Sequence, residues 1–159
     1  MRIALTLKSS FGCSGGIVIY MISKAAAGIA NIGVRREELN SNTINIMKPL
    51  FPHLNLEHIR IRPGSTIPPN WFKRRTKYVA ITFGYTIYCS ATDIQNTNEN
   101  LNVLMHELVH ADQVRRRDDS IAKFAGDYGK GYLHAGNYRN NPLEEEAFNF
   151  VNLNRLPES

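Results

Sequence analysis

The chain has 159 residues, of which 43% are hydrophobic and 21% are charged, and its formal net charge is +5. These values are typical of one globular domain, and no apolar run of about 18 residues predicts a membrane-spanning helix. The basic residues come without a nucleic-acid recognition motif, so solvated faces explain them better than a nucleic-acid partner. Cys13 and Cys89 lack C-x-x-C spacing and are too few for a disulfide framework, although a bridge between them stays open.

Residues 1–33 are expected to form an N-terminal leader and helix, ahead of one compact domain over residues 34–159. An apolar run that is followed by three alanines has the order of a signal peptide. However, Lys8 and Lys24 bracket that run, and a stretch of small polar residues interrupts it. We therefore favour a structured segment with a helix over residues 17–31 over a signal peptide.

The next part of the chain predicts one helix and a small sheet. Residues 37–50 are interpreted as partly helical, because two glutamates suit a first turn and apolar residues follow them. Residues 57–62 alternate polar and apolar side chains, which is typical of a strand with one solvated face. Residues 77–83 and 86–89 are rich in β-branched and aromatic side chains, and Gly84 between them indicates a hairpin or a bulge.

A longer helix is predicted after a loop at residues 90–96. Asn96 followed by Glu99 resembles a capping box and sets the helix start near residue 97. The apolar residues then recur at helical spacing and form one stripe, made of Leu101, Leu104, Met105, Leu108 and Val109. Three arginines over residues 115–117 suit the carboxyl end of this helix, because cations interact favourably with the helix dipole there.

Within this helix, residues 106–110 read His-Glu-Leu-Val-His. Histidines at i and i+4 project from one face of a helix, so His106 and His110 can bind one Zn²⁺. Glu107 lies about 100° around the helix, where it can act as general base on a metal-bound water. The capped, amphipathic context favours a metal site over a chance occurrence of the motif.

A catalytic zinc site usually has three protein ligands and one open position, so the chain after His110 has to supply the third ligand. The candidates are His134, Asp112, Asp127 and the glutamates Glu144, Glu145 and Glu146. Asp112 points away from the histidine pair, and residues 126–142 are mostly predicted as loop because of their glycines and asparagines. The three glutamates open a helix that begins after Pro142, and one of them is the favoured ligand because a helix holds a carboxylate rigidly.

Two segments carry a resemblance to a known family, namely His106-Glu-Leu-Val-His110-Ala-Asp-Gln113 and Tyr138-Arg-Asn-Asn-Pro142-Leu-Glu144-Glu-Glu146-Ala147. They resemble the bacterial metallopeptidase domain found with extracellular contractile injection systems, the eCIS-core domain. The strand–Gly–strand segment over residues 81–88 matches the lead-in of that family, and the resemblance covers roughly residues 56–150. The wider relation is to gluzincins, which implies Glu144 as the third ligand. Phe148 stands where many gluzincins carry an Asp that orients a ligand histidine, so Asp112, another carboxylate or a backbone carbonyl is expected in that role.

The motif and the resemblance together imply an α+β, zincin-like fold, with a small mixed or antiparallel sheet packed on the metal helix. They also imply a zinc metallopeptidase that acts on proteins or peptides, in a bacterial effector-like context. Zn²⁺ would bind His106, His110 and Glu144, and Glu107 would be the general base. An oxyanion donor is expected among the aromatic and His residues Tyr128, Tyr132, His134 and Tyr138, of which His134 and Tyr138 are favoured.

Two further expectations concern substrate binding and competing functions. The strand over residues 86–89 is the candidate edge strand for pairing with a substrate peptide. A zincin fold kept as a catalytically inactive binding or structural module is the main alternative, against which the intact Glu107 argues. A basic nucleic-acid-associated protein is the third hypothesis, and it would need groove-reading elements that the sequence lacks.

Overall fold

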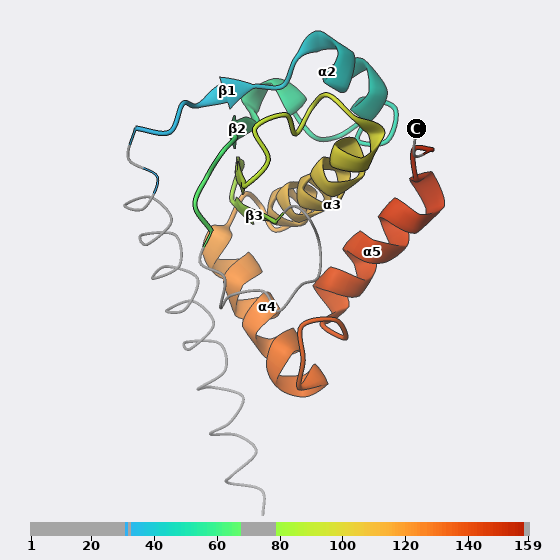
Figure 1. Ribbon diagram of the computed structural model, residues 1–159. Coiled ribbons are helices and arrows are strands. Elements are labelled where there is room, and N and C mark those ends of the chain that lie inside the picture. The colour runs from blue at the N-terminus through green and yellow to red at the C-terminus, as the bar shows by residue number, and fades with distance from the viewer. Residues whose placement is uncertain (1–30, 32, 68–78, 158–159) are drawn as a thin grey trace, which may run out of the picture.

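The computed structural model describes residues 31, 33–67 and 79–157 (Figure 1). The predicted leader and helix at the N-terminus, together with Cys13, fall almost entirely on residues outside this part of the chain. The described residues form an α+β fold with four α-helices and a mixed four-stranded sheet, which confirms the α+β class and the small mixed sheet that the sequence predicts. None of the described helices is both long and apolar enough to cross a membrane.

The sheet consists of β1 (Glu37–Glu38), β2 (Arg60–Arg62), β3 (Ala80–Phe83) and β4 (Thr86–Cys89), in the order β1-β2-β4-β3. β2 pairs with β4 in parallel, and the other two pairings are antiparallel. β3 and β4 form the predicted hairpin, and Gly84 in its turn has a φ of 63°, which glycine adopts without strain. The hairpin brings β3 to the end of the described sheet.

The expectation that residues 86–89 form an edge strand is wrong. β4 lies between β2 and β3, so both of its backbone edges are paired. Ile87, Tyr88 and Cys89 are all buried, which is the pattern of a central strand covered on both faces. Cys89 is a small buried hydrophobe, and burial raises the pKa of its thiol to about 12. The strand at the end of the described sheet is β3.

The helix predicted over residues 37–50 is shorter and begins four residues later than expected, at Ser41. Helix α2 spans Ser41–Met47, and the side chain of Asn40 caps it by accepting a hydrogen bond from the backbone N–H of Thr43 at 2.8 Å. Glu37 and Glu38 form β1 instead, ahead of that cap. The strand predicted over residues 57–62 also begins later, because residues 56–58 form a 3₁₀ turn.

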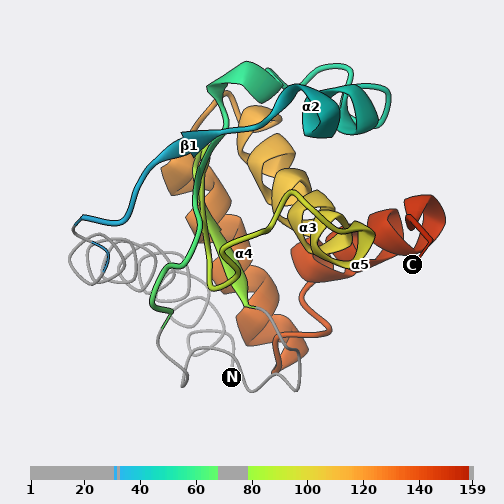
Figure 2. The ribbon, with the colours of Figure 1, turned by 45° about the horizontal axis from the view of Figure 1, so that its top comes forward.

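Helix α3 (Asn98–Arg115) runs through the middle of the fold, between the sheet and helix α5 (Pro142–Asn154) (Figures 1 and 2). It begins one residue later than the sequence predicts. Thr97, not Asn96, is the N-cap, and its hydroxyl accepts a hydrogen bond from the backbone N–H of Asn100 at 3.2 Å. Because α3 touches both the sheet and α5, side chains on its different faces meet groups from both layers.

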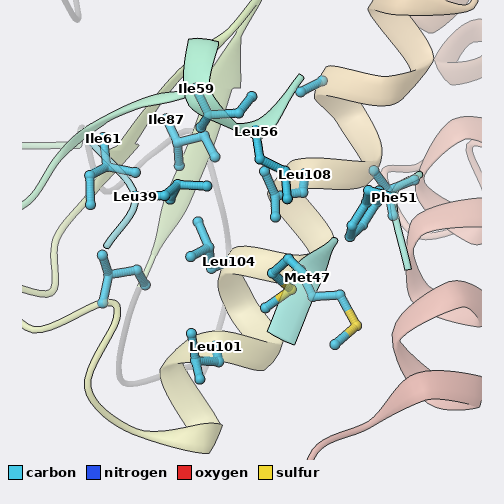
Figure 3. Close-up of a cluster of buried hydrophobic side chains, with 14 of the residues drawn as sticks. Leu39, Met47, Phe51, Leu56, Ile59, Ile61, Ile87, Leu101, Leu104 and Leu108 are labelled. Carbon is cyan, nitrogen blue, oxygen red and sulfur yellow. The ribbon is translucent and has the colours of Figure 1, made fainter. Parts of the chain in front are cut away.

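The predicted apolar stripe of α3 is confirmed as the centre of the core. Leu101, Leu104 and Leu108 face the sheet residues Ile61 and Ile87, and all five side chains are buried (Figure 3). Helix α2 and the segment after it close the other side of this cluster. Burial of a leucine or isoleucine side chain stabilises a fold by roughly 1.5–3 kcal/mol, so this cluster fixes the rotation of α3 about its axis.

The prediction that residues 126–142 are mostly loop is wrong, since helix α4 spans Ile121–Ala135. Ser120 caps this helix, and Gly136 ends it with a φ of 73°. Packing overrides the low helix propensity of its glycines. At Gly131 a Cβ atom would lie 2.5 Å from Oδ1 of Asn141, the residue that caps α5. Glycine therefore lets α4 approach the start of α5 closely.

We expect Gly131→Ala to lower the free energy of unfolding by about 1–2 kcal/mol, because the new methyl group displaces the Asn141 cap. A loss of stability would be specific to this contact, because Gly→Ala inside a helix normally raises the free energy of unfolding by about 0.5–1 kcal/mol. Urea-induced unfolding followed by circular dichroism measures the change. Lys130→Ala, at an exposed position of the same helix, is the matched control and should change stability by less than about 0.5 kcal/mol. A Gly131→Ala variant as stable as the original chain would contradict the close approach.

Candidate metal centre

The structure brings together the three side chains that the sequence favours as metal ligands. Nε2 of His106 lies 3.2 Å from Nε2 of His110 and 3.1 Å from Oε2 of Glu144. Nε2 of His110 lies 3.4 Å from Oε1 of the same carboxylate. The three residues are buried, and each offers one ligand atom within 4.8 Å of the other two. This group can hold a metal ion.

The buried negative charge of Glu144 is stabilised by positive charge placed between it and the two histidines. Burial alone would lower the pKa of His110, but its hydrogen bond to Glu144 and the charge of that carboxylate raise the pKa to about 9. Burial alone would raise the pKa of Glu144, but hydrogen bonds from both histidines hold it well below its usual range. A carboxylate enclosed by two imidazoles is stabilised by a shared proton or by a metal ion.

Several contacts fix the first turn of α5, where Glu144 stands. Oδ1 of Asn141 accepts from the backbone N–H of Leu143 at 3.2 Å, and Pro142 occupies the first helical turn. The amide of Asn141 also donates to the backbone carbonyl of Tyr128 at 3.0 Å, which ties α5 to α4. The carboxylate of Glu144 is thus held from two helices besides its own.

The helix also separates the three candidate glutamates. Glu145 is exposed, and Glu146 points toward α3, where it pairs with Arg116 and accepts from Nε2 of Gln113 at 3.0 Å. Only Glu144 reaches the histidine pair, because consecutive helical residues diverge by about 100°. The other candidates do not reach it either. Asp127 pairs with an arginine at the surface.

Tyr128 of α4 also contacts the group, through Glu144. Its hydroxyl donates to Oε1 of Glu144 at 2.7 Å. Burial, together with the charge of Glu144, raises the pKa of Tyr128 far above its usual value, so the hydroxyl stays a donor. The sequence places four aromatic or histidine candidates between the ligands, and one of them, Tyr128, contacts Glu144 directly. Tyr132 is 49% exposed.

Glu107 is buried beside the three ligands but is not one of them, as the motif predicts. The hydroxyl of Thr82 lies 2.8 Å from Oε2 of Glu107 and 3.1 Å from its backbone carbonyl oxygen. Thr82 belongs to β3, so the end strand of the sheet restrains this carboxylate. No motif of the sequence points to Thr82, because the contact depends on how the hairpin packs on α3.

The groups that hold the two histidine rings differ from the expected ones. The ring of Phe148 lies against His106, with ring centroids 4.8 Å apart, so an aromatic contact takes the place of an Asp. Nδ1 of His110 lies 2.9 Å from Oε1 of Gln113. Asp112, one of the expected partners, pairs instead with Arg115 and Arg116. Gln113 could have been found from its i+3 spacing to His110.

The two residues favoured as oxyanion donors differ in where they lie. His134 is exposed on the last turn of α4, and its Nδ1 lies 2.8 Å from the backbone carbonyl oxygen of Lys130. Tyr138, in the loop before α5, has its ring 6.5 Å from that of Phe148, which in turn contacts His106. The structure thus brings Tyr138 to the margin of the centre and leaves His134 on the surface.

Two imidazole nitrogens and one carboxylate oxygen are the donors that first-row divalent metals prefer in proteins. The buried carboxylate of Glu107 lies beside this group without belonging to it. Together, the group can bind a cation and Glu107 can accept or donate a proton. Comparisons of the chain with models of protein families, with curated proteins and with solved structures find no match.

Proposed function

We propose that the protein is a zinc-dependent metallopeptidase with a zincin-like fold. The observation that carries the proposal is the convergence of His106, His110 and Glu144 on one point, next to the buried carboxylate of Glu107. Two histidines and one glutamate, with one position left for water, are a known ligand set of catalytic zinc. A small mixed sheet packed on the metal helix, followed by a helix that carries the third ligand, supports the zincin-like assignment.

The ligand spacing supports zinc as the metal. Two atoms that each lie 2.0–2.1 Å from a tetrahedral zinc are roughly 3.3–3.4 Å apart. The two histidine Nε2 atoms lie 3.2 Å apart, and each lies 3.1 or 3.4 Å from a different oxygen of Glu144. A zinc ion therefore fits between the ligands with little movement of the side chains.

Each residue around the ligands then has a role in peptide hydrolysis. Zinc held by the group would lower the pKa of water at the open position and polarise the scissile carbonyl. Glu107 would accept a proton from the attacking water and pass it to the leaving amine. The hydrogen bond from Thr82 keeps the carboxylate of Glu107 in one orientation, and Tyr128 does the same for Glu144.

The substrate is a peptide in extended conformation, which we expect to pair with β3 and not with β4. β3 ends the described sheet, and its Thr82 contacts the general base, so a peptide beside this strand would pass close to Glu107. Pairing of the backbone gives affinity with little dependence on sequence, and alternate side chains give specificity.

Removal of the metal tests the proposal directly. We expect the purified chain to bind one Zn²⁺ and to hydrolyse casein, and we expect a strong chelator to abolish the hydrolysis. Added Zn²⁺ should restore it, because the ligands are held by the fold and not by the metal alone. Elemental analysis and a fluorescent casein assay measure the two properties. Hydrolysis that persists in the metal-free protein would contradict a metal-dependent reaction.

A second candidate function is a catalytically inactive module that uses the same metal for stability. The burial of the ligands favours it, since His106, His110 and Glu144 are only 5%, 6% and 2% exposed. Structural zinc sites are, however, usually closed by four ligands and rich in cysteine, and they have no use for a general base. This candidate predicts that Zn²⁺ raises the unfolding temperature while no peptide is hydrolysed.

A further inference from the structure

Gln113 is fully buried at 0% exposure and lies one helical turn beyond His110 on α3. Its side chain has three partners at once. Oε1 lies 2.9 Å from Nδ1 of His110, while Nε2 donates to the backbone carbonyl of Leu143 at 2.9 Å and to Oε2 of Glu146 at 3.0 Å. A buried amide with all of these partners has a single orientation.

The partners determine which end of the amide faces the histidine. A backbone carbonyl and a carboxylate only accept hydrogen bonds, so both N–H groups of Gln113 point to Leu143 and Glu146. Oε1 is therefore the atom that faces His110, and an amide oxygen only accepts. It follows that Nδ1 of His110 carries a proton and that Nε2 is the nitrogen left to bind a metal ion. Nε2 is the nitrogen that lies 3.2 Å from Nε2 of His106, in the metal group.

The same side chain joins two of the ligands mechanically. Leu143 directly precedes Glu144, so the hydrogen bond from Gln113 to its carbonyl holds the first turn of α5 against α3. The backbone carbonyl of Gln113 accepts from Arg117 at 2.9 Å, which braces the end of α3. Any displacement of Gln113 would disturb both the ring of His110 and the position of Glu144.

We propose that Gln113 is the positioning residue of the metal centre, which holds His110 as the Nδ1–H tautomer and ties it to the start of the helix that carries Glu144. The inference rests on the metal-binding part of the proposed function and not on peptide hydrolysis. Outer partners of metal-binding histidines typically change metal affinity by 10–100-fold, which sets the size of the expected effect.

The first test compares Gln113→Met with Asp112→Asn. Methionine has nearly the shape of glutamine but neither accepts from His110 nor donates to Leu143. We expect Gln113→Met to weaken Zn²⁺ binding by about 10–100-fold, measured by competition with a chromophoric chelator. Asp112→Asn, one residue earlier on α3 and paired with Arg115 and Arg116, should weaken it by less than about threefold. Equal affinities of the two variants would overturn the proposal, provided that circular dichroism shows both to be folded.

The second test uses the unchanged chain and so holds even where Gln113→Met does not fold. The protein is labelled with ¹⁵N-histidine and loaded with ¹¹³Cd²⁺, and its imidazole signals are recorded by NMR. We expect scalar coupling of ¹¹³Cd to Nε2 of His110 and a slowly exchanging Nδ1–H on the same ring. Coupling to Nδ1 of His110 would overturn the proposal.

The outcomes separate this inference from the proposed function. If the unchanged chain binds Zn²⁺ and Gln113→Met binds it equally well, the role of Gln113 is wrong and the metallopeptidase stands. If the unchanged chain binds Zn²⁺ but hydrolyses no peptide, the peptidase is wrong and the role of Gln113 stands. A chain that binds no Zn²⁺ overturns both.

Discussion

Glu107→Gln is expected to lower kcat for casein hydrolysis by about 10²–10⁴-fold while leaving one Zn²⁺ bound per chain. Glutamine has the shape of glutamate, and its amide oxygen can still accept the hydrogen bond from Thr82 at 2.8 Å. Its amide cannot accept the proton of the attacking water at neutral pH. Because Glu107 is not one of the three ligands, the metal content should not change.

The matched control is Glu145→Gln, the same chemical change at an exposed position next to Glu144. It should keep both the zinc and the activity. Kinetics, elemental analysis and circular dichroism on the two variants separate a lost base from a lost metal or a lost fold. Full activity of Glu107→Gln would show that Glu107 is not the general base, and loss of its zinc would show that Glu107 also holds the metal.

Glu144→Ala should weaken Zn²⁺ binding by more than about 100-fold, beyond the range of an outer-partner substitution. It removes the only carboxylate among the three ligands and leaves a cavity in a site that is 2% exposed. Thermal unfolding with and without Zn²⁺ measures the binding independently. Zn²⁺ at about 100 times its Kd should stabilise the original chain by about 2.7 kcal/mol, whereas the variant should gain almost nothing.

Glu145→Ala and Glu146→Ala complete this experiment, because sequence alone leaves all three glutamates as candidates. Glu145 is exposed, so Glu145→Ala should keep its zinc affinity. Glu146→Ala removes a hydrogen-bond partner of Gln113 and should weaken zinc binding, but less than Glu144→Ala does. A larger loss of affinity in either of them than in Glu144→Ala would move the third ligand to that residue and contradict the geometry of α5.

The sequence suffices to predict the parts of the fold that depend on local periodicity. The stripe from Leu101 to Val109 predicts both α3 and its buried face, and the spacing of the two histidines then follows from the helix. The β3–β4 hairpin follows from Gly84, which has the positive φ that its turn requires. His106, His110 and Glu144 come together as the family resemblance implies, whereas the helix that begins near Pro142 leaves Glu144, Glu145 and Glu146 as candidates.

The parts that cannot be read from the sequence depend on packing between distant segments. α4 contains glycines that predict a loop, but one of them, Gly131, allows this helix to approach Asn141 closely. Thr82 and Tyr128 reach Glu107 and Glu144 through the sheet and through that helix, at sequence separations for which no motif exists. Such contacts become visible only once the hairpin and α4 are placed against α3.

The most direct measurement of the central claim is anomalous diffraction at the zinc absorption edge, from crystals of the protein grown with Zn²⁺. We expect one strong peak bonded to Nε2 of His106, Nε2 of His110 and a carboxylate oxygen of Glu144, each at about 2.0–2.1 Å. Glu107 should lie close to the metal without binding it. A peak at any other set of residues, or a peak with Glu107 among its ligands, would contradict the proposed centre.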